Sequence, residues 1–222
     1  MFQSKQLAAL VPMRHHSIRV PGKNYRLLAG EPLYSYILKT LLSCPEIAKI
    51  IVDTDSPIIQ EGVERDFPTV QLINRPEELR GSTVPMNDVI MHDVTQIPAD
   101  VYIQTHCTNP LLRPETVRRA IRKFMDSYPE HDSLFSVTPF QMRLWDAGGN
   151  PINHEPSVLL RTQDLEPLFV ENSCLYIFER ETFLAHGNRL GERPLMFEID
   201  AEEALDIDNE LDFTVVDCLM LR

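Results

Sequence analysis

The chain has 222 residues and a formal net charge of −12, and 43% of its residues are hydrophobic and 24% charged. This length suits one domain of ordinary size rather than two, and the composition is that of a globular rather than a disordered chain. The excess of acidic residues argues against a nucleic-acid polymer as partner, because that binding depends on neutralising phosphates with lysine and arginine.

Strands and helices are expected to alternate along the chain. Apolar residues at helical spacing occur, for example, at Leu33, Ile37 and Leu38, and residues 53–57 carry the cap and early proline that open a helix. The alternation predicts an α/β fold with a mostly parallel sheet wrapped by helices. We expect strands over 7–11, 47–52, 70–73, 101–104, 133–138, 175–178 and 196–199, and helices over 33–42, 57–65, 86–95, 114–125 and 209–221.

Residues 139–172 break this pattern. Short extended pieces surround the sequence GGNP at 148–151, which is a turn signal. We therefore expect a small arm or lid here, inserted into a single domain that spans residues 1–222.

Signals for export, membrane insertion and disulfide formation are missing from the sequence. No run of 18 apolar residues occurs, and MFQSKQLAALVP lacks the basic head, long apolar core and cleavage site of a signal peptide. We expect a cytoplasmic protein with no membrane partner. Without a CxxC pair, neither a zinc ribbon nor a disulfide framework is indicated. We expect four reduced, buried thiols at Cys44, Cys107, Cys174 and Cys218.

The most informative stretch is LVPMRHHSIRVPGKN, residues 10–24. Its apolar part ends at Pro12, and Arg14, Arg19 and Lys23 follow before the first helix. In open α/β sheets, ligands bind at such strand-to-helix loops, and guanidinium, ammonium and free backbone N–H groups suit a polyphosphate. The spacing matches neither the P-loop nor the dinucleotide GxGxxG pattern. We expect Arg14 and Lys23 to bind a phosphate chain, with a solvated basic loop as the alternative.

A pair of carboxylates stands before the last predicted helix. If Asp206 and Asp208 lie on an extended stretch, their side chains point the same way, as a shared Mg²⁺ site requires. The alternative is that Asp208 only caps the helix, which would leave Asp206 without a role.

Six segments of the chain resemble, in the family's order, parts of the cytidylyltransferases that activate sialic acid and 3-deoxy-octulosonic acid as CMP sugars. The loop pattern PxRxxSxRxPGKN at 12–24 is similar to the signature loop of that family. QTHCTNPLLR at 104–113 looks like its Gln-Pro-Thr-Ser-Pro-Leu-Arg stretch, with one extra residue and with His106 and Cys107 altered. DID at 206–208, followed by ELDF, looks like the end of the family's fold. NRPEEL at 74–79 with the following Ser82 resembles the base-reading loop, and RTQDL at 161–165 and NSCLY at 172–176 resemble segments near the sugar pocket and the dimer arm.

The resemblance implies a Rossmann-like nucleotidyltransferase that transfers CMP from CTP to a 2-keto-3-deoxy sugar acid, such as a sialic-acid-like nonulosonate, and releases pyrophosphate. It also implies Mg²⁺ on Asp206 and Asp208 and a homodimer formed through the arm. The residues expected to take part are, for catalysis, Arg14, Lys23, Asp206 and Asp208; for the nucleotide, Arg14, Ser17, Lys23, Asn24, Arg75 and Ser82; and for the acid, Gln104, Arg143, Arg161 and Gln163.

The sequence departs from the family pattern at three further places. His15-His16 stands where sialic acid synthetases usually have small residues, and we expect these side chains to contact phosphate or to be exposed. Ser173-Cys174 replaces a smaller pair. The lysine usual after the fifth strand is absent, and Arg143 is expected to pair with the acid there. The acceptor could therefore be 3-deoxy-octulosonate, a phosphonate or another acid, and a non-catalytic nucleotide-binding protein is the alternative from another class.

Overall fold

Seven strands form one sheet in the computed structural model, which describes residues 5–221. The order is β5-β4-β1-β6-β8-β7-β9; the first four are parallel, β8 is antiparallel to both of its neighbours, and β9 is parallel to β7. The mostly parallel sheet predicted from the sequence is confirmed. The strands are β1 Leu7–Met13, β4 Lys49–Thr54, β5 Gln71–Asn74, β6 Val101–Thr105, β7 Ser133–Phe140, β8 Leu168–Glu179 and β9 Pro194–Glu198.

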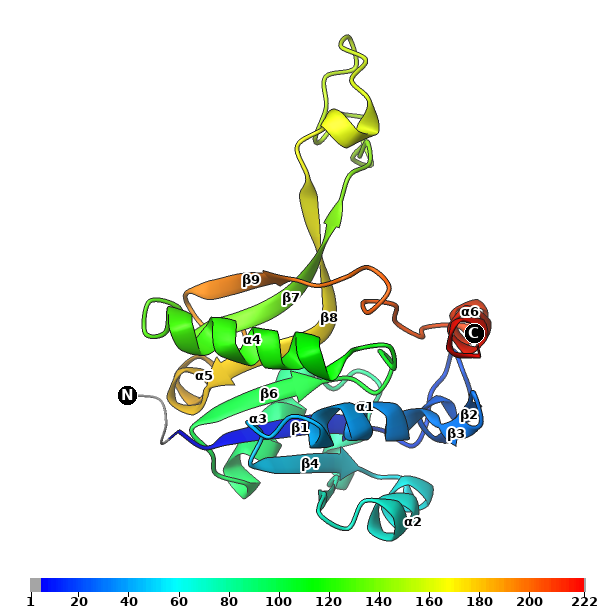
Figure 1. Cartoon of the computed structure of the whole chain (residues 1–222), viewed down its shortest axis with the longest axis vertical. Coiled ribbons are helices and arrows are strands. Elements are labelled where there is room, and N and C mark those ends of the chain that lie inside the picture. Colours follow the sequence, from blue (N-terminus) through cyan, green and yellow to red (C-terminus); the bar gives the residue numbers. More distant parts are fainter. Residues whose placement is uncertain (1–4, 222) are drawn as a thin grey trace.

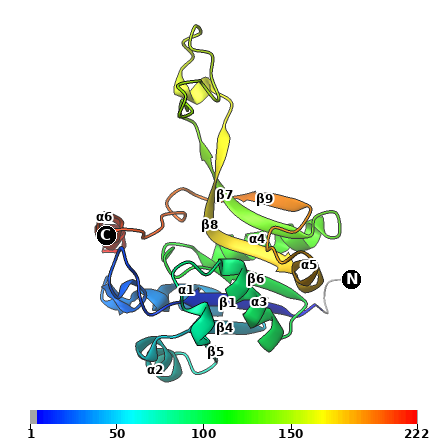
Figure 2. The same ribbon diagram turned by 180° about the vertical axis from the view of Figure 1, so that it is seen from behind.

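Helices cover both faces of the sheet. On one face, α1, α2 and α4 pack against the strands in the larger core cluster, and on the other face α3 and α5 form a second cluster. Figure 1 shows the first face and Figure 2 the second. Because both faces are covered, all seven residues of β1 are buried, as expected of a central parallel strand. The helices are α1 Leu33–Leu42, α2 Pro57–Asp66, α3 Met86–Gln96, α4 Pro114–Ser127, α5 Arg180–His186 and α6 Glu210–Met220.

The long predicted elements are all present, but β8 begins at Leu168, well before the strand predicted at 175–178, and several short elements were missed. Helix α2 begins where its signal predicts, with the Ser56 side chain accepting a hydrogen bond from the Ile59 N–H and Pro57 in the first turn. Helix α5 was not predicted, because its seven residues include one buried apolar side chain, Phe183, and so show no periodicity. The strands β2 (Leu27–Leu28) and β3 (Glu31–Pro32) were also missed, because two residues are too few to show an alternating pattern.

The segment over 139–172 projects from the sheet (Figure 1). Its base is a regular antiparallel ribbon, in which β7 and β8 continue to pair from Val137–Glu171 out to Phe140–Leu168. Residues 141–167 carry an isolated bridge between Trp145 and Pro151 and a short 3-10 turn, η3, over Thr162–Asp164. Several large apolar side chains are exposed there: Met142, Trp145, Ile152, Val158, Leu159 and Leu160.

A third, smaller core cluster attaches the C-terminal segment to the residues between β1 and α1. Ile207 packs in it with Phe213 and Val216 of α6 and with Val20 and Leu28 of the segment after β1. This packing brings the residues before α6 next to the basic loop.

The predictions on the cysteines and on membrane-spanning segments can also be compared with the structure. Three of the cysteines are buried free thiols, but the prediction for Cys218 is wrong, since it lies exposed on α6. Within residues 5–221, no helix combines the length and the apolar character needed to cross a membrane.

Candidate active site

A cavity of about 750 Å³ lies at the carboxyl ends of β1 and β6. This is the edge at which open α/β sheets bind ligands. Eight of the predicted site residues line it: Arg14, Ser17, Lys23, Asn24, Arg75, Ser82, Asp206 and Asp208.

The basic loop after β1 closes on itself through Asn24. The Asn24 Nδ2 donates to the Arg14 carbonyl at 2.8 Å, and its Oδ1 accepts from the Cys107 Sγ at 3.2 Å. Gly22, with φ of 68°, lies in the left-handed region that favours glycine and starts the 3-10 turn η1 (Lys23–Tyr25). Lys23 is 9% exposed, and its Nζ donates to the Ile207 carbonyl at 2.5 Å. The loop thus presents its cations at one end of the cavity, with their backbone fixed.

His15 has a structural role that the sequence did not predict. Its backbone N–H donates to Asp55 Oδ1 at 2.6 Å, its Nδ1 lies 2.7 Å from Ser56 Oγ, and its ring stacks on Tyr25 at 5.2 Å between centroids. His15 therefore ties the basic loop to the start of α2. The expectation of exposure holds for His16.

The two acidic residues of the 206–208 segment reach the cavity on either side of a buried residue. Ile207 is fully buried, and its N–H donates to the Thr108 carbonyl at 2.9 Å. Asp208 Oδ1 lies 2.7 Å from Arg19 Nη2 and 3.7 Å from Lys23 Nζ. Asp208 does not cap α6, because the side chain of Asn209 accepts from the first N–H groups of that helix.

The protein around Asp206 changes the protonation of its carboxyl group. Although the Asp206 side chain is open to the cavity, the surrounding protein atoms raise its pKa by desolvation, and the negative charge of Asp208 adds to this. The side chain of Thr108 and the charge of Lys23 oppose the shift. A cation bound between two such carboxylates would reduce the repulsion between their negative charges.

Arg75 and Ser82 also line the cavity. Arg75 is 4% exposed and forms an ion pair with the buried Asp53, and its Nη2 lies 3.3 Å from the Asp53 carbonyl. Four apolar residues from the neighbouring segment line the cavity with it: Leu79, Val84, Met86 and Val89. This part of the lining, the apolar wall, therefore combines apolar side chains with one guanidinium.

Gln104 lies behind the cavity wall in a fixed hydrogen-bond network. Its Oε1 accepts from Arg189 Nη1 at 2.6 Å, and its Nε2 donates to the Thr105 carbonyl at 3.1 Å. The Nε2 is also 3.0 Å from His106 Nε2, which must accept because Nε2 of Gln104 can only donate. The neutral state of His106 that this requires agrees with its pKa, which desolvation and then the Arg189 charge lower to about 4.

Arg189, which the sequence analysis missed, contacts Gln104 but lies, like it, outside the set of lining residues. Its guanidinium lies over the Tyr176 ring at 3.7 Å from the centroid, and the Tyr176 hydroxyl lies 3.1 Å from the Oγ of Ser173, which lines the cavity. Desolvation lowers its pKa. No motif marks it, because it stands alone in the turn after the unpredicted helix α5.

Gln104 is fully buried behind the wall, and the other three residues predicted to bind the acid do not line this cavity either. Arg143, Arg161 and Gln163 all lie in the arm, outside the set of lining residues. Arg143 donates to the Leu160 carbonyl, and Arg161 pairs with Asp164 at 2.7 Å.

Comparisons with known proteins show what the chain is similar to. A family model described as cytidylyltransferase matches residues 8–212. CMP-N,N'-diacetyllegionaminic acid synthase of Legionella pneumophila is 30% identical, over 97% of this chain and 96% of that protein. N-acylneuraminate cytidylyltransferase A of Danio rerio is 25% identical over 99% of this chain, which spans about half of that longer protein.

Solved structures share the fold at lower identity. A structure of CMP:2-keto-3-deoxy-manno-octonic acid synthetase complexed with CTP matches with a TM-score of 0.71 and 16% identity, covering 97% of this chain and 98% of that one. A 4-diphosphocytidyl-2C-methyl-D-erythritol synthase matches with a TM-score of 0.69 and 14% identity, over 98% and 99% of the two chains. With the family model matching nearly the whole length, the chain belongs to the cytidylyltransferase family of nucleotidyltransferases.

Proposed function

We propose that this protein transfers CMP from CTP to a 2-keto-3-deoxy sugar acid and releases pyrophosphate. The observation that carries the proposal is that one cavity has Arg14 and Lys23 in its lining together with Asp206 and Asp208. Cations are needed where the leaving group gains charge, and carboxylates where a metal-assisted nucleophile attacks. The names of the relatives, which are synthases of CMP-activated acidic sugars, support the same acceptor class.

In this proposal the basic loop binds the phosphates. Arg14 and Lys23 stabilise the negative charge that shifts to the leaving pyrophosphate, through charge-assisted hydrogen bonds that strengthen as the charge develops. Lys23 would exchange its hydrogen bond to the Ile207 carbonyl for one to phosphate. Ser17 lines the same end of the cavity, and Asn24 keeps the loop closed.

We assign the magnesium site to Asp206 and Asp208. Both residues line the cavity, both offer the oxygen ligands that Mg²⁺ prefers, and their mutual repulsion favours a cation between them. When bound, Mg²⁺ would neutralise phosphate charge and lower the pKa of the acceptor hydroxyl. The chain's own part is to fix the backbone between the two carboxylates at Ile207, while Arg19 holds Asp208 by an ion pair.

The nucleoside and the acid would bind at two different parts of the remaining lining. Arg75 and Ser82 would contact cytosine and ribose on the apolar wall. Gln104 and Arg189 would meet the acid beyond His106, where a guanidinium suits a carboxylate. Which sugar acid fits, a nonulosonate, an octulosonate or another acid such as a phosphonate, depends on this end of the cavity.

We further propose a homodimer formed through the arm. The exposed apolar side chains at 142–160 favour a protein interface there. Arg143, Arg161 and Gln163 could then contact the acid in the cavity of the second copy, since the arm carries them away from their own.

Pyrophosphate release tests the function. The purified protein is incubated with Mg²⁺, each of the four nucleoside triphosphates and a panel of sialic, legionaminic, octulosonic and phosphonate acceptors. Release that requires CTP and one acid is the expected result and identifies the acceptor. CTP binding without release for any acceptor would favour the alternative of a non-catalytic nucleotide-binding protein.

A further inference from the structure

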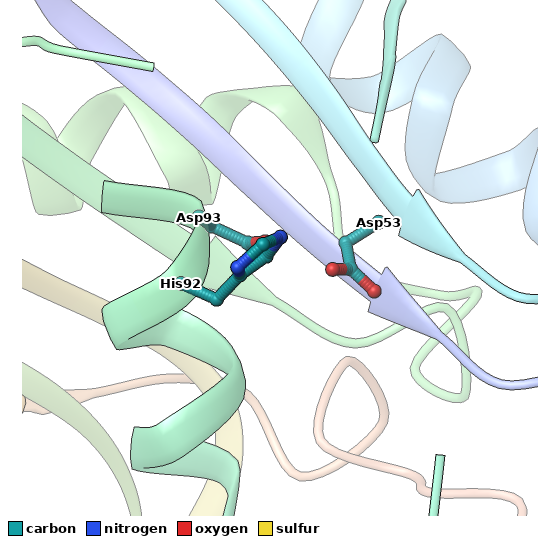
Figure 3. A group of neighbouring side chains, drawn as sticks. All are labelled: Asp53, His92 and Asp93. Carbon is teal, nitrogen blue, oxygen red and sulfur yellow. The ribbon is translucent and has the colours of Figure 1, made fainter. Parts of the chain in front are cut away.

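Arg75, in the apolar wall of the cavity, belongs to a buried cluster of charged residues. Asp53 at the end of β4 and Asp93 in α3 are both fully buried. Figure 3 shows the side chains of Asp93 and His92 extending from the helix toward Asp53. One oxygen of each aspartate and one ring nitrogen of His92 lie within 4.8 Å of one another.

This cluster has one negative charge too many if both aspartates are ionised. Arg75 supplies a single positive charge and pairs with Asp53. Both carboxyl oxygens of Asp93, and Oδ2 of Asp53, find no hydrogen-bond donor among residues 5–221 other than a carboxyl proton. A fully buried carboxylate without donors is strongly unfavourable, so the cluster needs either a proton or a cation.

The charge balance favours the proton. One proton on the two aspartates, together with Arg75, makes the cluster neutral, whereas a divalent ion beside the guanidinium would leave it positive. Burial, followed by the charge of Asp53 and a hydrogen bond with it, raises the pKa of Asp93 to about 9, and Arg75 opposes the shift. The charged or titratable groups that face Asp93 are thus Asp53 from β4, Arg75 from the segment after β5 and His92 from its own helix.

We propose that Asp93 is a positioning residue for nucleotide binding: in its neutral form it donates its carboxyl proton to Asp53 and so fixes the carboxylate that holds Arg75 in the cavity wall. The proposal rests on the proposed function, in which Arg75 contacts the nucleoside. Two features connect the pair to the cavity. Arg75 lines it directly, and α3 contributes Met86 and Val89 to the same wall. Within the described residues, Nη1 of Arg75 has no hydrogen-bond partner, which leaves it available to a ligand.

Asparagine and alanine at position 93 separate this role from mere packing. Asparagine has the shape of a neutral aspartic acid and keeps a donor toward Asp53. We expect Asp93→Asn to keep the KM for CTP within about threefold of wild type, and Asp93→Ala to raise it at least tenfold with kcat changed less than threefold. In wild type the KM for CTP should rise as the pH passes 9, whereas in Asp93→Asn it should stay level. Asp88→Asn, an exposed acid on the same helix, is the matched control.

Several outcomes would overturn the proposal. One is an Asp93→Ala protein with wild-type KM, and another is an Asp93→Asn protein as impaired as Asp93→Ala, which would mean that the ionised carboxylate is needed. A third is a stoichiometric metal found by elemental analysis in wild type and lost in Asp93→Asn. If Asp93→Ala does not fold, the alkaline KM profiles of wild type and Asp93→Asn decide. If wild type neither binds CTP nor turns it over, the proposed function fails separately, and calorimetric proton uptake on folding of wild type against Asp93→Asn still tests the shared proton.

Discussion

Replacing Asp93 with asparagine is expected to change how the stability of the protein depends on pH. In the folded protein the pKa of Asp93 is raised to about 9, whereas in an unfolded chain it would be near 3.8. Between these values the folded state holds a proton that the unfolded state has released. The free energy of unfolding therefore falls as the pH rises through this window, and the loss ends once the pH exceeds the folded-state pKa.

The size of this change in the free energy of unfolding follows from the difference of one bound proton between the folded and unfolded states. The slope is about −1.4 kcal/mol per pH unit while the folded state is protonated and the unfolded state is not. From pH 6 to 8, wild type should lose about 2.5 kcal/mol relative to Asp93→Asn, whose amide does not titrate. For a chain of this size, that corresponds to a relative change in Tm of about 5–10 °C.

Urea denaturation at pH 6, 7 and 8 measures the effect. Comparing wild type with Asp93→Asn cancels the histidines and other groups that titrate in both proteins, and Asp88→Asn should follow wild type. Parallel stability profiles for wild type and Asp93→Asn would refute the reasoning, because they would show that Asp93 has the same protonation in both states.

Three further predictions concern the cavity. Asp208→Ala should abolish pyrophosphate release but change the free energy of unfolding by less than about 1 kcal/mol, because its ion pair with Arg19 is exposed; activity retained near the wild-type level would contradict the metal assignment. Arg189→Gln should raise the KM for the acid by about 10–100-fold, the value of a charge-assisted hydrogen bond, and leave the KM for CTP unchanged; equal effects on both would argue against an acid-binding role. Ile207→Ala should lower the free energy of unfolding by about 2–5 kcal/mol, measured by urea denaturation, because a fully buried side chain is truncated.

Much of the fold could be predicted because the long elements carry their own signals. Leu33–Leu42 shows helical periodicity, and its predicted bounds match α1. The reversed direction of β8 could not be predicted, because a buried strand has the same apolar pattern in either direction.

The site was predictable only where several polar residues stand close together in sequence. The basic loop and the 206–208 segment form such groups, and both line the cavity. Arg189, Asp53 and Asp93 are single residues whose role depends on contacts across 22 to 85 positions of sequence, which no local pattern reveals. Nor could sequence tell that the arm directs Arg143 away from the cavity of its own chain.

The junction between the arm and the sheet has a mechanical consequence. From Phe135 to Val137 on β7, the partner residues on β8 run from Tyr176 to Glu171, so β8 bulges where the ribbon leaves the sheet. Ser173 lies in this bulge with φ of 58°, a left-handed conformation that costs a residue with a Cβ about 1 kcal/mol, and it also lines the cavity. A rotation of the arm about the bulge would therefore move a wall of the cavity. Contacts that fix the arm would change ligand affinity, and by thermodynamic reciprocity a bound ligand would change the strength of those contacts equally.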